Sequence, residues 1–96
     1  METVQSLREA GNRVSVTHFR WYKSSDGMML LTRRMAECLG VKKALQARGG
    51  ATVVQIREKI GAIPKVGVAR CHTIDPFNRK RALKIAVARA LSGEDQ

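Results

Sequence analysis

The chain has 96 residues, of which 44% are hydrophobic and 27% charged, with 18 Lys and Arg residues against 8 Asp and Glu residues. This length and composition predict one small basic domain, residues 1–96, and exclude a disordered chain. The chain contains no run of about 20 apolar residues, so no membrane-spanning helix is expected.

The positive charge lies almost entirely in residues 11–93, which hold 17 basic and 4 acidic residues, a net charge of +13. An excess of that size indicates an anionic partner, with DNA or RNA first and an acidic or nucleic-acid-binding protein second. Two cysteines, Cys38 and Cys71, are too few for a disulfide framework and predict reduced thiols. The polar N-terminus does not resemble a secretory signal, so we expect a cytoplasmic protein that makes no membrane contact.

The first half of the chain predicts a β-hairpin. Residues 13–23 are rich in β-branched and aromatic side chains and predict a strand. Four turn formers at residues 24–27 and the apolar residues 28–31 complete the hairpin signal. Before it, residues 1–11 predict either a short helix or a loose arm.

A short helix is expected after the hairpin, with Thr32 as its N-cap and Gly40 at its end. Residues 41–45 continue this helix after a kink or form a second short piece. Gly49 and Gly50 end the segment.

Residues 51–58 and 65–72 return to β character and predict a second antiparallel pair, joined by the link at residues 59–64. The last element is a helix over residues 75–93, followed by a tail at residues 94–96. We therefore expect an α+β fold with two β-hairpins and two helices in the order ββαββα.

The expected C-terminal helix has a full set of start and stop signals. Asp75 can act as its N-cap, Pro76 suits the first helical position, and Gly93 can form the C-terminal cap. One arc of this helix is rich in small residues and is expected to pack closely on the antiparallel sheet. The arc consists of Ala82, Leu83, Ala86, Val87 and Ala90.

Basic residues gather on the rest of the helix, where no acidic residue alternates with them. A solvated face is the simpler interpretation of such a charge run, and contact with a polyanion is the functional one. We expect the nucleic-acid contacts to come from the helix, with help from two residues of the preceding strands. The residues are Arg79, Lys80, Arg81, Lys84 and Arg89 on the helix, and Arg57 and Arg70 on the strands.

Aromatic residues at positions 19, 21 and 22 alternate with basic ones, as on sheets that stack nucleic-acid bases. Because the chain has only four aromatic residues, we expect Phe19 and Trp21 to be core anchors instead. Tyr22 and Arg20, on the other face of the strand, then remain for ligand contact. Arg48, before two glycines, could serve a phosphate, but a helix terminus with flexible glycines is the favoured interpretation.

Enzymatic chemistry has little support in the sequence. The two cysteines and two histidines lack the spacing of a zinc site, and no phosphate-binding loop or nucleophile motif occurs. Four widely separated carboxylates in residues 11–93 do not suit a two-metal nuclease. We expect a protein without cofactor, metal or catalytic activity.

The segment from residue 68 to 80, with Cys71, Asp75 and Phe77, resembles a C-terminal pattern of small phage and prophage proteins of unknown function. Those proteins often carry a glycine after the Phe, where this chain has Arg81 and Ala82. The resemblance implies no activity and transfers no functional residue to this chain. It raises an alternative function, that of a small inhibitor or regulator of a host protein or ribonucleoprotein, such as an anti-CRISPR-like protein. The first expectation remains non-enzymatic nucleic-acid binding through phosphates, and the sequence does not fix the oligomeric state.

Overall fold

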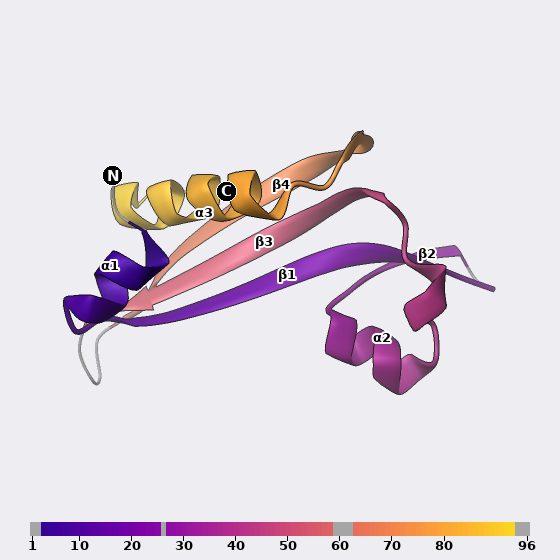
Figure 1. Ribbon diagram of the computed structural model, residues 1–96, viewed down its shortest axis with the longest axis horizontal. Coiled ribbons are helices and arrows are strands. Elements are labelled where there is room, and N and C mark those ends of the chain that lie inside the picture. The colour runs from indigo at the N-terminus through magenta and orange to yellow at the C-terminus, as the bar shows by residue number, and fades with distance from the viewer. Residues whose placement is uncertain (1–2, 26, 59–62, 94–96) are drawn as a thin grey trace.

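The structure, a computed structural model, describes residues 3–25, 27–58 and 63–93. In that part of the chain, a four-stranded antiparallel sheet and three α-helices form an elongated molecule of 43 × 26 × 22 Å (Figure 1). None of these helices is long and apolar enough to cross a membrane. The elements in chain order are α1 (Val4–Glu9), β1 (Arg13–Ser24), β2 (Gly27–Leu31), α2 (Arg33–Leu39), the 3-10 helix η1 (Lys42–Ala44), β3 (Arg48–Arg57), β4 (Lys65–Pro76) and α3 (Arg79–Ser92).

The strands are ordered β2-β1-β3-β4, with the long strand β1 shared by both halves of the sheet. Its first half pairs with β3, from Arg13 opposite Arg57 to Phe19 opposite Ala51, and its second half pairs with β2. The α+β class, the antiparallel sheet and the packed C-terminal helix are thereby confirmed. Residues 4–9 form a helix rather than a loose arm, because a capping box at Thr3 starts it and Leu7 packs into the core.

The main core lies between α3 and the sheet. Ala82, Ala86 and Ala90 are at most 8% exposed, as the small-residue arc predicts. They let the helix backbone approach β4, where a Cβ added to Gly67 would lie 1.9 Å from the carbonyl oxygen of Ala86. Val54 of β3 is fully buried beneath the helix.

A second, smaller core lies at the far end of β1, where α2 packs beside the β1–β2 hairpin (Figure 1). The Thr32 hydroxyl accepts a hydrogen bond from the Met35 N–H at 3.2 Å, and Gly40 ends the helix in a left-handed conformation. Both cap predictions for α2 are confirmed. The chain then forms the separate short piece η1 instead of continuing the helix after a kink.

The predicted start of the last helix is wrong. Asp75 and Pro76 are the last residues of β4, and the N-cap of α3 is Asn78, whose Oδ1 accepts the Arg81 N–H at 3.0 Å. Pro76 pairs with Arg48, so backbone pairing continues past the local start signals. The helix does end at Gly93, as expected.

The favoured interpretation of Gly49 and Gly50 as a helix terminus is also wrong. Both lie inside β3, with φ of 76° and 137°, at a register shift against β4. Glycine is favoured at such an irregularity because it adopts positive φ without steric cost. The predicted link at residues 59–64 is described only for its last two residues.

Candidate nucleic-acid interface

Four basic side chains project from the first two turns of α3. Arg79, Lys80, Arg81 and Lys84 are all exposed, and the opposite side of the helix is buried on the sheet. Lys80, Arg81 and Lys84 lie away from the buried arc, whereas Arg79 has the helical position of Ala86 and Ala90 and is exposed at the helix start. These four residues are called here the outward face of α3. Because the buried arc fixes the helix on β3 and β4, the positions of their Cα atoms are fixed too.

No acidic residue balances these charges on the helix. The first turn of α3 contains no acid, and its residues 79–92 include none at all. A helix N-terminus carries a partial positive charge of its own, so basic side chains there add to the helix dipole instead of offsetting it. The result is a locally intense positive potential at the start of α3.

The ion pairs in the described residues lie elsewhere. The Glu37 carboxylate forms ion pairs with Arg33 at 3.3 Å and with Lys42 at 3.4 Å, and the Glu58 carboxylate forms one with Lys65 at 2.6 Å. All three pairs are solvent-exposed and contribute little to stability. Two of the few carboxylates of this basic chain, Glu37 and Glu58, therefore form their ion pairs with residues outside α3.

Three of the seven predicted contact residues do not join the outward face of α3. Arg89 is half-buried, and its Nη1 donates a hydrogen bond to the Val68 carbonyl at 2.8 Å, which ties α3 to β4. Arg57 and Arg70 are exposed, but strand alternation places them on the sheet face that α3 does not cover. These two residues therefore do not lie beside the helix.

Replacement of Arg89 by Leu is expected to destabilise the protein by about 1 kcal/mol, because the Val68 carbonyl loses a charged donor. Polyanion affinity should change by less than about twofold once the loss of one long-range charge is included. Urea unfolding and an oligonucleotide titration measure the two quantities. A large loss of affinity with unchanged stability would contradict this structural assignment.

Phe77 forms the centre of a polar and aromatic cluster just before α3. The Arg20 guanidinium lies 4.6 Å from the centre of its ring, and the His18 ring meets it edge-on with centroids 6.0 Å apart. Arg20 also donates to the Gln46 carbonyl at 3.2 Å. Arg20 was expected to remain for ligand contact. It instead packs on Phe77 in a cation–π contact and helps fix the start of α3.

His18 makes a hydrogen-bonding contact with a fully buried threonine in the same cluster. Its Nδ1 is 2.7 Å from the Thr52 hydroxyl, and Thr52 is 0% exposed. Burial, and after it the charges of Arg79 and Arg20, hold the pKa of His18 below its ordinary value. The neutral imidazole is therefore the form that the fold accommodates.

The free energy of unfolding is expected to fall in mildly acidic solution because of His18. The unfolded chain binds a proton on this residue near pH ~6.5, whereas the folded chain binds it only at lower pH. The stability that neutral His18 contributes is thus complete above the unfolded-state pKa and is lost as the pH falls through the folded-state pKa. Urea unfolding of His18→Gln should show a shallower pH dependence below pH ~6.5 than the parent chain, with the exposed His72→Gln as control. Parallel profiles for His18→Gln and the parent would contradict the assignment.

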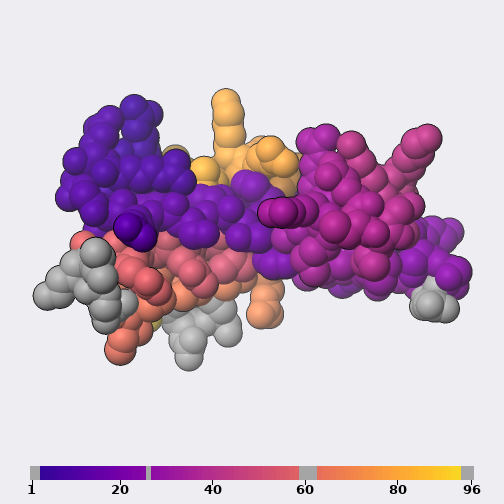
Figure 2. All heavy atoms as spheres, turned by 90° about the horizontal axis from the view of Figure 1, so that it is seen from below, coloured from indigo at the N-terminus to yellow at the C-terminus, as the bar shows by residue number. Residues whose placement is uncertain are grey.

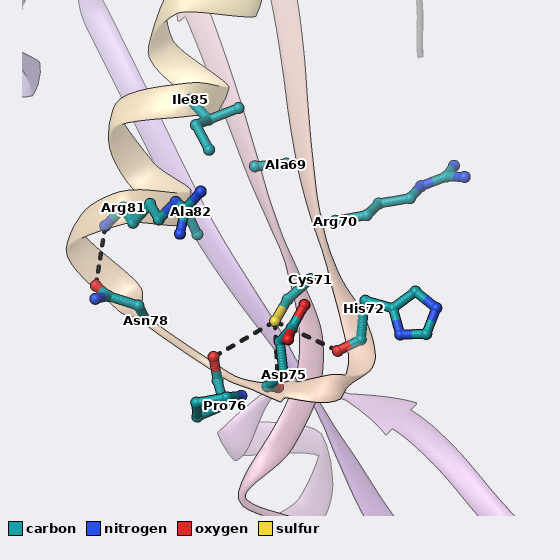
Figure 3. Close-up of a pocket in the computed structure, with 10 residues that line it drawn as sticks. All are labelled: Ala69, Arg70, Cys71, His72, Asp75, Pro76, Asn78, Arg81, Ala82 and Ile85. Atoms are coloured by element: carbon teal, nitrogen blue, oxygen red, sulfur yellow. Dashed lines mark hydrogen bonds between the residues drawn. The ribbon is translucent and has the colours of Figure 1, made fainter.

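A groove of about 400 Å³ separates the end of β4 from the first turns of α3 (Figure 3). The Cys71 thiol lies in it, within 3.5–3.6 Å of the carbonyl oxygens of His72, Asp75 and Pro76. Arg81 lines the helix side, while Arg70 and His72 point away from the groove. Arg81 already belongs to the outward face of α3, so the groove adds only the Asp75 carboxylate beside that surface.

The aromatic residues of β1 are placed opposite to expectation. Tyr22 is 3% exposed and belongs to the smaller core with Leu31 and Ala36. Phe19 and Trp21 are only partly buried and belong to neither core cluster. Strand alternation places them on the face opposite Val14 and Tyr22, which is the helix-free face of the sheet. Figure 2 shows the elongated molecule with α1 (indigo) at one end and the region of α2 (magenta) toward the other. The expectation of Phe19 and Trp21 as core anchors is therefore wrong.

Comparison of the chain with protein-family models, curated proteins and solved structures gives no match. Among the described residues, no three His, Cys, Asp or Glu side chains come together as metal ligands. Cys38 and Cys71 are free thiols. A function is therefore inferred from the outward face of α3.

Proposed function

We propose that this is a non-enzymatic nucleic-acid-binding protein that contacts phosphates through the outward face of α3. One observation carries the proposal: four exposed bases, Arg79, Lys80, Arg81 and Lys84, occupy two helical turns with no acid among the residues of the helix. Like charges so close together cost stability in isolation, since Lys80 and Lys84 lie one turn apart. Phosphates would relieve that repulsion.

The form of the surface supports phosphate contact more than base reading. Arginine and lysine at a helix N-terminus match a negatively charged backbone in both charge and hydrogen-bond donors. Contacts of this kind position a protein on nucleic acid without reading its sequence. We therefore expect weak sequence preference and an affinity that falls steeply with salt.

The proposal is tested by titrating a labelled random oligonucleotide with the purified chain at two salt concentrations, by filter binding or fluorescence anisotropy. The expected result is binding at low salt that weakens steeply as salt rises. Absence of binding at low salt, together with stoichiometric copurification of an acidic host protein, would refute it and favour an inhibitor or regulator of that protein.

A further inference from the structure

The helix-free face of the sheet carries a second basic surface that differs in kind from α3, because it also holds aromatic rings. Alternate residues of β1, β3 and β4 lie side by side there in rows set by the strand register. The residues of this surface are Arg13, Ser15, Thr17, Phe19 and Trp21 of β1, Ala51, Val53, Gln55 and Arg57 of β3, and Val66, Val68 and Arg70 of β4.

We propose that this face binds single-stranded nucleic acid, with bases stacked on Phe19 and Trp21 and phosphates held by Arg13, Arg57 and Arg70. The inference rests on the function proposed above and names its ligand class. The two surfaces lie on different sides of the sheet, so each can be tested without the other.

Charge is the first argument. Arg13 and Arg57 are directly opposite each other on β1 and β3, and both are exposed. Like charges in a cross-strand pair are destabilising. Among the described residues, neither takes part in an ion pair, and no acidic residue occupies the rows of this face. A bound phosphate would neutralise the pair.

The position of the aromatic rings is the second argument. The chain has one Trp, one Tyr and two Phe residues, and two of these four rings lie on a face that no helix covers. The Trp21 indole lies against Gly49, since a Cβ there would be 2.7 Å from the ring carbon Cδ1. Gly49 therefore lets the ring approach the β3 backbone. A hollow of about 530 Å³ beside the indole, lined also by Met28, Arg48 and Thr73, leaves room for a second planar group.

These features favour single strands over other occupants. Unpaired bases expose their faces for stacking on aromatic side chains of a sheet, while bases in a duplex are already stacked on one another. Ser15, Thr17 and Gln55 add hydroxyl and amide groups for base edges. A second copy of the chain is disfavoured on this face, because it would bring two sets of arginines together.

Trp21 is the only tryptophan, so its fluorescence reports on this face directly. Titration with oligo(dT) and oligo(rU) should quench it saturably, and duplex of equal length should compete poorly. Trp21→Leu and Phe19→Leu should each weaken single-strand binding by roughly 5- to 150-fold, the range for loss of one stacked base. Binding by Trp21→Leu, which lacks the fluorophore, is measured by anisotropy of a labelled strand. The preferred oligonucleotide identifies the natural ligand as DNA or RNA.

A second pair of variants keeps the proposal testable if the aromatic changes disturb folding. Arg57→Gln should weaken single-strand binding and reduce its salt dependence, with a slope lower by about 0.7. The control is Lys65→Gln, since Lys65 pairs with Glu58 and faces the other side of the sheet.

Three results would overturn the inference. They are unchanged Trp21 fluorescence with saturating oligonucleotide, equal competition by duplex, and a homodimer that buries this face. If the fluorescence is unchanged but Lys80→Gln/Lys84→Gln still weakens oligonucleotide binding, only this inference falls. If no oligonucleotide binds at all, the proposed function falls with it.

Discussion

Substitution of Gly67 by Ala is expected to destabilise the protein by about 3 kcal/mol or more, near the upper end for overpacking of a close-packed interface. The added Cβ would lie 1.9 Å from the Ala86 carbonyl oxygen and 2.5 Å from the Ala90 nitrogen. Both are backbone atoms of α3, so no side-chain rotation relieves the clash. The helix itself must move away from β4.

In a domain of this size, such a loss corresponds to a fall in melting temperature of about 12–24 °C, measurable by thermal unfolding followed by circular dichroism. Gly40→Ala is the matched control. Its Cβ meets nothing within 4 Å, but φ is 74°, so only the conformational cost of about 1–2 kcal/mol applies.

A second variant separates a backbone clash from a side-chain clash. Ala86→Gly removes a methyl group but leaves the carbonyl oxygen in place, so it should not rescue Gly67→Ala. Full rescue, or a Gly67→Ala chain as stable as the parent, would contradict the close approach of α3 to β4.

The second large effect concerns the outward face of α3. The double variant Lys80→Gln/Lys84→Gln should weaken oligonucleotide binding roughly tenfold or more at low salt, because two phosphate contacts are lost. The slope of log affinity against log salt concentration should fall by about 1.4 for single strands and about 1.8 for duplex. Both lysines are exposed, so the free energy of unfolding should change little.

Lys42→Gln/Lys43→Gln is the matched control, because it lowers the formal net charge of +10 by the same two units from exposed positions in η1. If both doubles reduce the slope equally, the binding depends on total charge and not on the outward face of α3. That outcome would contradict the proposed site while leaving polyanion binding intact.

The local signals of the sequence predicted most elements of the fold, but not the start of α3. Asp75 and Pro76 have the chemistry of a helix start, yet Pro76 pairs with Arg48 and the Phe77 N–H donates to the Ala47 carbonyl at 3.3 Å. Pairing between segments far apart in sequence thus overrides a favourable cap, and Asn78 serves as the cap instead. Such pairing is not visible in a local pattern.

The candidate site could be predicted only in part, because contacts between segments far apart in sequence are again not visible in a local pattern. Helical spacing correctly separated the small buried residues from Lys80, Arg81 and Lys84. It did not separate them from Arg79, which has the helical position of Ala86 and Ala90 and is exposed at the helix start. Strand alternation separated the two faces of β1, but it did not say which face the helices cover. A sequence signal does exist in β4, where the small residues Gly67 and Ala69 alternate with larger ones and leave space for a helix on their own face of the sheet.

The central claim is that acid-free basic surfaces persist on this small fold because nucleic acid binds there. The most direct test is the equilibrium titration of the purified chain with a labelled single-stranded oligonucleotide at two ionic strengths. The account predicts saturable binding at low salt that weakens steeply at higher salt. No binding at the lower ionic strength would contradict it.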